Sequence, residues 1–231
     1  NKSDGSSSVI SELAPEAPAD SWKLIYDPKV VAQMAGCGLS VVDAPSEVIA
    51  TALMAMGKDP NDLSPEALSA AEKLLLGMRP SVRKIDSLTQ IEDLANGSQC
   101  LLLTWPADVI RARARARESG REVDFRYVIP KEGTIRWIDT LTIPADAPNR
   151  AEAHAFIDFL MHADVAARNA NFIGTPSANS AALPMIDEAL RTDPNVYPTA
   201  EVRAKLVSLR ARTQEESRLE NRVWTRFRTG Q

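Results

Sequence analysis

The sequence predicts an α/β fold with a largely parallel sheet, and three features support this class. Short apolar stretches alternate with segments of helical pattern, an order typical of α/β architecture. The run Cys100–Leu103 is continuously apolar, as in a parallel strand that is buried on both faces. Proline in the first turn and glycine after the last turn mark several expected helices.

The elements of the first half follow from these signals. Residues 1–19 are expected to form a flexible tail or linker, because Lys2–Ser8 is rich in glycine and serine. The expected elements then begin near Trp22 and are, in order, helix Pro28–Ala35, strand Leu39–Val42, helix Glu47–Met56, helices Pro65–Met78 and Leu88–Ala95, strand Gln99–Thr104 and a helix that begins at Pro106.

The second half adds fewer strands. Phe125–Ile129 and Trp137–Ile143 have the composition of strands, and from Asn149 onward the pattern is mostly helical. Strands are therefore outnumbered by helices more strongly than in an ordinary doubly wound domain. We expect part of the sheet to be missing from this chain.

Composition limits the partners of the chain. Its 231 residues are 44% hydrophobic and 25% charged, with a net charge of −4, which is ordinary for a globular protein. The acidic balance argues against nucleic acid, whose phosphates require a basic face, and suits a cationic ligand slightly better. No apolar run approaches the ~20 residues of a membrane-spanning helix.

The two cysteines, Cys37 and Cys100, each lie beside an expected strand. From the residues alone they are either buried and reduced or paired, and a pair would indicate an oxidising compartment. Neither belongs to a CxxC motif, which argues against a structural zinc site.

No common catalytic motif is present. The sequence contains no GxSxG, P-loop, GxGxxG or HExxH pattern. The only histidines, His154 and His162, are eight residues apart and are expected on the surface or at helix ends. The sequence therefore predicts no catalytic residue, no metal and no cofactor.

Acidic and aromatic residues instead gather at two expected strand-to-helix junctions and within one expected strand. They form three clusters: Asp43 with Glu47, Trp105 with Asp108, and Trp137 with Asp139. Ligands of open α/β sheets bind beyond the carboxyl ends of the strands, and carboxylates beside aromatic faces suit ammonium groups on a methylene chain. The alternative is that the acids favour helix first turns and the tryptophans belong to the core.

Four arginines alternate with alanine over Arg111–Arg117. On a helix, residues two apart point about 200° away from each other, so the four side chains do not form one stripe. We expect a solvated helix face here rather than a nucleic-acid site.

Ordered strings over Asp20–Gly230 resemble the polyamine-binding proteins of bacterial importers, and the putrescine-preferring type most of all. The matching strings are Asp20–Trp22, Asp43–Val48, Gly57–Asn61, Asp93–Gly97, Thr104–Asp108, Ile129–Gly133, Trp137–Asp139, Ile143–Ala147, Ala178–Ala182 and Tyr197–Pro198.

The resemblance implies a fold, a site and a disulfide. The fold is the two-lobed periplasmic-binding-protein type II fold, with a polyamine held between the lobes. A disulfide joins Cys37 and Cys100. The family's ammonium-binding acids correspond to Glu47, Asp108 and Asp139, and its aromatic wall to Trp105 and Trp137.

The chain also departs from the family. Thr175 stands where a tyrosine is frequent, and about a hundred residues that precede Asp20 in the family have no counterpart. We therefore expect most of the first lobe to be missing. Residues 20–128 would form the main part of the second lobe, 129–172 a remnant of the first lobe, and 173–231 the return to the second lobe.

The expected function is a periplasmic receptor that binds putrescine or spermidine and delivers it to the permease of an ABC transporter. Such a protein meets the membrane only through its permease, and an uncovered sheet edge would favour self-association. One alternative is a truncated lobe that binds no ligand and acts as an interaction module. The other is a carboxylate-based α/β enzyme with Glu47 and Asp108 as acid and base.

Overall fold

The computed structural model describes residues 16–121 and 126–231. They form two compact units: the first contains the described residues up to Arg136 together with Ala204–Gln231, and the second is Trp137–Arg203. These boundaries differ from the expected lobe boundaries near residues 129 and 173, and the division into lobes stays a prediction.

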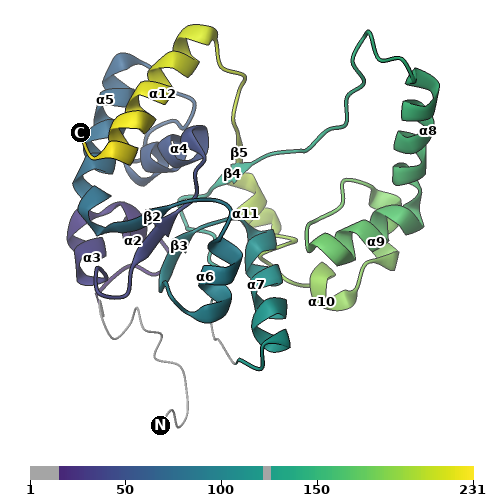
Figure 1. Cartoon of the computed structure of the whole chain (residues 1–231), viewed down its shortest axis with the longest axis horizontal. Helices are drawn as coiled ribbons and strands as arrows, with labels where there is room; N and C mark the ends of the chain where they lie inside the picture. Colours follow the sequence, from purple (N-terminus) through teal and green to yellow (C-terminus); the bar gives the residue numbers. More distant parts are fainter. Residues whose placement is uncertain (1–15, 122–125) are drawn as a thin grey trace. The chain divides into compact units, whose positions relative to one another are not determined.

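The first unit contains a parallel sheet and the helices that cover it (Figure 1). Its elements are α2 (Lys23–Tyr26), α3 (Pro28–Gln33), β1 (Leu39–Val41), α4 (Pro45–Ala55), α5 (Pro65–Met78), η1 (Arg79–Ser81), β2 (Val82–Ile85), α6 (Gln90–Asn96), β3 (Leu101–Leu103), α7 (Pro106–Glu118), β4 (Ile135–Arg136), β5 (Val207–Ser208) and α12 (Gln214–Thr229).

The sheet has the strand order β2-β1-β3, with both pairs parallel. Leu39 lies opposite Leu101 and Val41 opposite Leu103. Since β1 and β3 run in the same direction, their carboxyl ends lie at the same edge of the sheet. The chain continues from these two ends into α4 and α7.

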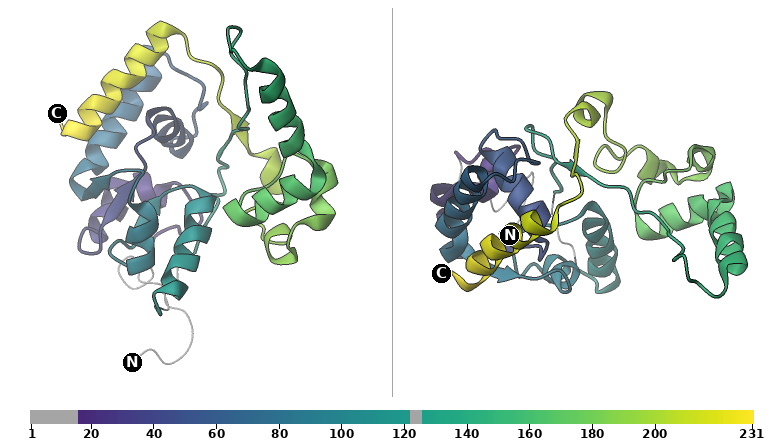
Figure 2. Two further views of the ribbon diagram at one scale, coloured as in Figure 1. Left: turned by 45° about the vertical axis from the view of Figure 1, so that its right-hand side comes forward. Right: turned by 90° about the horizontal axis from the view of Figure 1, so that it is seen from above.

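Helices cover both faces of this sheet, as Figure 1 shows. Leu101 and Leu103 pack into the large core formed with α4, α5 and α12, whereas Leu102 packs against the smaller core of α6 and α7. This alternation follows from the strand, in which successive side chains point to opposite faces. Helix α12 lies alongside α5 (Figure 2) and buries Phe227 completely.

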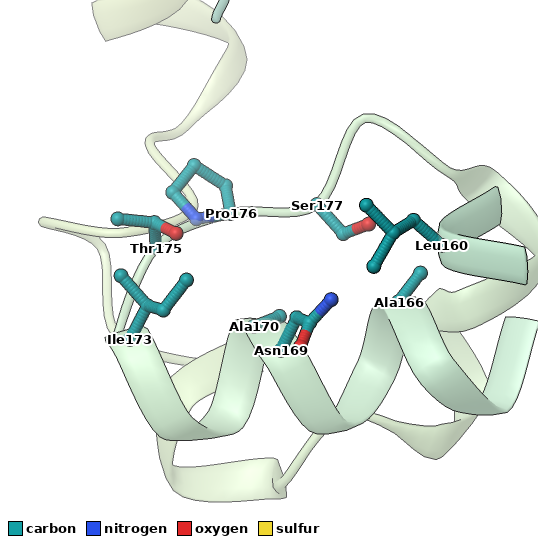
Figure 3. Close-up of a pocket in the computed structure, with 8 residues that line it drawn as sticks. All are labelled: Leu160, Ala166, Asn169, Ala170, Ile173, Thr175, Pro176 and Ser177. Carbon is teal, nitrogen blue, oxygen red and sulfur yellow. The ribbon is translucent and has the colours of Figure 1, made fainter. Parts of the chain in front are cut away.

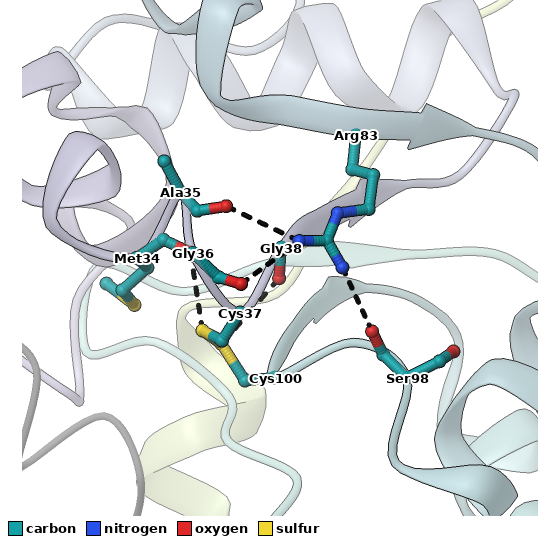
Figure 4. The surroundings of a disulfide bond; sticks show 8 residues. All are labelled: Met34, Ala35, Gly36, Cys37, Gly38, Arg83, Ser98 and Cys100. Carbon is teal, nitrogen blue, oxygen red and sulfur yellow. Dashed lines mark hydrogen bonds between the residues drawn. A yellow bond between two sulfur atoms is a disulfide. The ribbon is translucent and has the colours of Figure 1, made fainter.

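The predicted disulfide between Cys37 and Cys100 is confirmed (Figure 4). Their Cα atoms are 5.5 Å apart, within the usual range for a disulfide. Arg83 of β2 braces both flanking loops, because its guanidinium donates to the carbonyl oxygens of Gly36 (3.1 Å) and Ser98 (3.3 Å). The disulfide thus links the amino ends of β1 and β3.

The strand predictions were only partly correct. Phe125 lies outside the described residues, and the rest of the Phe125–Ile129 segment forms no strand. The expected strand Trp137–Ile143 is also wrong, because regular pairing in this region is limited to Ile135–Arg136 with Val207–Ser208. A strand requires a neighbour for its backbone groups. Among the described residues, no strand pairs with Trp137–Ile143.

The two-stranded ladder of β4 and β5 is anchored on the start of the described chain. The indole of Trp22 donates to the carbonyl oxygen of Gly133 (2.8 Å). Glu132 accepts from the Trp22 backbone N–H (3.3 Å) and from the Ser21 hydroxyl. Gly133 has a φ of +95°, and a Cβ there would collide with the backbone of Lys205. These contacts join two of the strings that carry the family resemblance.

The second unit is helical, and its helices bury little. Its elements are α8 (Arg150–Met161), α9 (Ala163–Ile173), η2 (Ser180–Met185), α10 (Glu188–Arg191) and α11 (Ala200–Ala204), which reaches the boundary. His154 and His162 are exposed, as expected. Within the described residues, no helix combines the length and apolar character required to span a membrane.

Candidate functional site

Two helices begin where adjacent parallel strands end, and both first turns carry an acid. Helix α4 follows β1 and contains Glu47, and helix α7 follows β3 and contains Asp108. Each helix has proline at its first position, where the missing N–H costs nothing and the fixed φ suits a helix. The pairing of β1 with β3 therefore brings the two acidic turns to one edge of the sheet.

A hydrogen bond joins the two turns. The Trp105 indole Nε1–H donates to Oε2 of Glu47 over 2.8 Å, although the residues are 58 positions apart. Both side chains are half-buried. Burial raises the pKa of Glu47 to about 7, and the bond from Trp105 offsets only part of that rise. The carboxyl group is thus poised to lose its proton when a cation approaches.

Asp108 lies in the first turn of α7, three residues after the cap residue Trp105, and is only 9% exposed. Its Oδ2 accepts a hydrogen bond from the Thr104 hydroxyl at 3.1 Å. Burial raises the pKa of Asp108, while Thr104 and the charge of Arg111 act in the opposite direction. A half-buried acid bonded to an indole, with a buried acid in the next helical turn, favours a positive charge.

Asp43 has a structural role instead. Its Oδ1 accepts from the indole of Trp224 at 3.0 Å, and its Oδ2 lies 3.5 Å from the guanidinium of Arg228. Both partners belong to α12, more than 180 residues further along the chain. Sequence patterns alone gave no signal for these contacts, because only the packing of α12 brings them together.

Trp137 and Asp139 lie in the second unit, in an exposed segment without regular structure. Trp137 is 46% exposed. The structure joins Glu47 to Trp105 and places Asp108 in the first turn of α7 within the same unit, whereas Trp137 and Asp139 belong to the second unit. A role of all five residues in ligand binding stays a prediction.

A separate pocket of about 190 Å³ belongs to the second unit alone (Figure 3). Apolar and uncharged polar side chains line it, namely Leu160, Ala166, Asn169, Ala170, Ile173, Thr175, Pro176 and Ser177. It contains Thr175, the position at which the chain departs from the resembled family. Without a carboxylate in its lining, this pocket does not fit an ammonium ligand.

Three of the four arginines of α7 are exposed, as expected of a solvated helix face, and Arg113 is half-buried. Arg111, Arg115 and Arg117 are exposed, whereas Ala112 and Ala116 of the same helix are buried. Arg115 pairs with Glu92 at 3.1 Å.

The chain is similar to curated periplasmic binding proteins. It is 40% identical over 223 residues to the putrescine-binding periplasmic protein PotF of Escherichia coli (strain K12), covering 96% of this chain and 60% of that protein. It is 38% identical over 222 residues to the putrescine-binding periplasmic protein SpuD of Pseudomonas aeruginosa (strain UCBPP-PA14), with the same coverage. The chain thus spans about 60% of the length of these relatives.

Solved structures support the same fold. A protein described as a putative spermidine/putrescine ABC transporter from Listeria monocytogenes matches with a TM-score of 0.82 at 24% identity, covering 96% of this chain and 65% of that one. PotD from Streptococcus pneumoniae, a spermidine/putrescine ABC transporter substrate-binding protein, matches with a TM-score of 0.77 at 20% identity, with the same coverage. The chain has the α/β fold of type II periplasmic binding proteins over the part that it covers. Residues 10–199 match the family described as bacterial extracellular solute-binding protein, and the chain belongs to that family.

Proposed function

We propose that this chain is the ligand-binding part of a periplasmic receptor for linear polyamines, which delivers putrescine or spermidine to an ABC transporter permease. The observation that carries the proposal is the bond between Trp105 and a half-buried Glu47 whose pKa is raised to about 7. Relatives named as putrescine-binding proteins support the choice of ligand class.

The chemistry of the site suits a primary ammonium group. An ammonium must lose water when it enters a protein, and close carboxylates offset that cost. Glu47 and Asp108 supply two acids, both with a pKa raised by burial. The indole of Trp105 adds a face for a cation and for methylene groups. In this proposal Trp137 and Asp139 complete the wall and the charge around the ligand.

Calorimetric titration of the chain with putrescine and spermidine tests the proposal. We expect binding that releases protons near pH 7, because the bound ammonium favours the charged form of Glu47. The measured heat should therefore vary with the ionisation enthalpy of the buffer. Recovery of unmodified ligand supports a receptor, whereas turnover would support an enzyme.

Substitutions identify the binding residues. Asp139→Asn keeps the shape and removes one charge. Because the proposed complex buries Asp139 against an ammonium group, the substitution should weaken binding by about 2–5 kcal/mol. Trp105→Ala should cost about 1–2 kcal/mol through lost cation–π contact. Asp158→Asn, at an exposed position of α8, is the matched control and should bind as the parent does.

Two results would contradict the proposal in different ways. If Asp139→Asn bound polyamine as tightly as the parent, Asp139 would have no place in the site. If the parent bound no polyamine, the proposed function of this chain would fail, and the interaction-module alternative would have to be tested.

We also infer that the chain self-associates through exposed apolar side chains of the second unit. Phe156, Phe159 and Phe172 are 58%, 51% and 90% exposed, and a second copy of the chain would remove such apolar surface from water. Sedimentation velocity tests this point, and a single monomeric species at every concentration would contradict it.

A further inference from the structure

Helix α12 contributes a buried carboxylate close to the proposed site. Glu220 is 3% exposed. Its Oε2 accepts a hydrogen bond from the hydroxyl of Ser46 at 3.0 Å, and its Oε1 lies 3.3 Å from Nε of Arg212. The Arg212 side chain is 10% exposed. A buried ion pair of this kind is costly to break, because one charge is then left without compensation.

Arg212 belongs to the segment that connects β5 to α12. Asn61, in the loop between α4 and α5, holds this segment with its side-chain amide. Its Oδ1 accepts from the backbone N–H of Arg210 at 2.9 Å and from Nη1 of Arg212 at 3.2 Å, and its Nδ2 donates to the carbonyl oxygen of Ser208 at 3.1 Å. The guanidinium that faces Glu220 is therefore fixed from two sides.

Ser46 directly precedes Glu47 in the first turn of α4. The cap residue of this helix, Ala44, has no side chain that could bond to the turn. A helix start without a side-chain cap leaves backbone donors without a side-chain acceptor and frays more readily. Asp43 ties the residues just before this turn to Trp224 of α12, and the bond from Ser46 to Glu220 anchors the turn itself to the same helix.

We propose that Glu220 is a positioning residue for the Glu47–Trp105 pair. Arg212 orients the Glu220 carboxylate, and the carboxylate holds Ser46 and with it the first turn of α4. The turn is thus already ordered before a ligand binds, and Glu47 accepts the bond from the Trp105 indole in the ligand-free chain. The effect on binding rests on the proposed polyamine-binding function, whereas the effect on the Glu47–Trp105 bond does not.

The decisive variant is Ser46→Ala, which removes one hydroxyl and leaves the ion pair intact. Its matched control is Ser64→Ala, because Ser64 caps α5 by accepting from the Ala67 N–H at 3.2 Å. Both variants lose one serine hydrogen bond near a helix start, but only the first loses a bond to Glu220. Ser46→Thr retains a hydroxyl and tests rescue.

Two readouts report on position rather than stability. The first is the Trp105 indole N–H signal in NMR spectra of the ligand-free chain, assigned with Trp105→Phe. In Ser46→Ala we expect its hydrogen exchange to accelerate and its shift to move upfield. The second is putrescine affinity, which should weaken about five- to tenfold, the ordinary worth of one hydrogen bond. Ser64→Ala should leave both readouts unchanged.

A double substitution tests whether Ser46 acts through Glu220. Because Glu220→Ala removes the acceptor of the Ser46 hydroxyl, we expect Ser46→Ala to add nothing to its effect on putrescine affinity. Additive effects would overturn the proposal. If Glu220→Ala did not fold, Ser46→Ala and its control would decide alone.

The remaining outcomes separate this inference from the proposed function. If the parent bound no putrescine, the function would fail while the indole signal still tested the positioning role. Glu220 would have no positioning role if Ser46→Ala left the indole exchange rate and the putrescine affinity within a factor of two of the parent values. The same would follow if Ser64→Ala changed both quantities as much as Ser46→Ala does.

Discussion

The two units of the chain differ in how they are held together. The first buries large side chains such as Leu53 and Phe227 completely, in a core that joins both the sheet and its helices. The described core cluster of the second is formed by Ala167, Ala170, Ala182 and Ile186, and Val165 and Val196 are also buried. No residue of α8 is buried. Since apolar burial is the main stabilising term, the first unit has its own core, and the second has few apolar contacts to support it.

This difference explains where the proposed site is best formed. Glu47, Trp105 and Asp108 belong to the unit with the large core, which fixes the strands and helix starts that carry them. Trp137 and Asp139 belong to the other unit and are exposed. A binding site requires side chains that neighbouring packing holds in place, so the first unit supplies its ordered part.

The largest expected contrast is between two phenylalanine substitutions. Phe227→Ala, at a position with 0% exposure in the first unit, should lower the free energy of unfolding by about 3–5 kcal/mol. Phe172→Ala, at 90% exposure in the second, should change it by less than about 0.5 kcal/mol. Urea unfolding followed by tryptophan fluorescence measures both. Equal effects would contradict the described difference between the units.

Loss of the disulfide should rank next. The bond joins residues 63 positions apart, and replacing both cysteines by serine should lower the free energy of unfolding by about 2–4 kcal/mol, because the unfolded chain regains freedom. Since Cys37 and Cys100 both lie in the first unit, hydrogen exchange should accelerate there and remain unchanged in α8 and α9. Uniform acceleration would show that the units unfold together.

The sequence predicted elements well where local chemistry alone decides them. Helix Pro65–Met78 was placed at its observed bounds, because proline opens it and Ser64 caps it. Strand β2 was missed, since Val82–Ile85 contains Arg83 and Lys84 and lies at the edge of the sheet, where polar residues are tolerated. The wrong strand at Trp137–Ile143 has a strand-like pattern without a neighbour to pair with.

For the site, the sequence located residues but not their contacts. Strand-end positions and the family resemblance identified Glu47, Trp105 and Asp108. The bond between Trp105 and Glu47 depends on the register of β1 with β3 and on two side-chain conformations, which no local pattern encodes. Glu220 was missed for the same reason, because it reaches Ser46 across 174 positions.

Titration of Glu47 should produce a smaller effect, confined to a pH window. Its pKa is about 7 in the folded chain and near 4.5 when unperturbed, so the folded state retains a proton that the unfolded state loses between these values. The free energy of unfolding should therefore fall as pH rises from 4.5 to 7. Glu47→Gln does not titrate, so its free energy of unfolding relative to that of the parent should rise by about 1 kcal/mol from pH 5 to pH 8, after allowance for screening by solvent. Urea unfolding at both pH values measures this, and an equal difference at both would contradict the raised pKa.

The smallest effect should come from a surface ion pair of the second unit. Arg168 lies 2.9 Å from Asp164 on α9, and the two side chains are 70% and 61% exposed. Exposed pairs four residues apart on a helix contribute about 0.3–0.5 kcal/mol, and salt screens them. Asp164→Asn should therefore lower the free energy of unfolding by no more than this amount, and the loss should disappear in molar salt.

The buried pair of Arg212 with Glu220 is the counterpart in the first unit, with side chains only 10% and 4% exposed. The effect of Glu220→Gln should persist in the same salt, because ions do not reach a buried pair. If salt abolished both effects equally, Glu220 would have to lie at the surface, and the described contrast between the two units would fail at this pair.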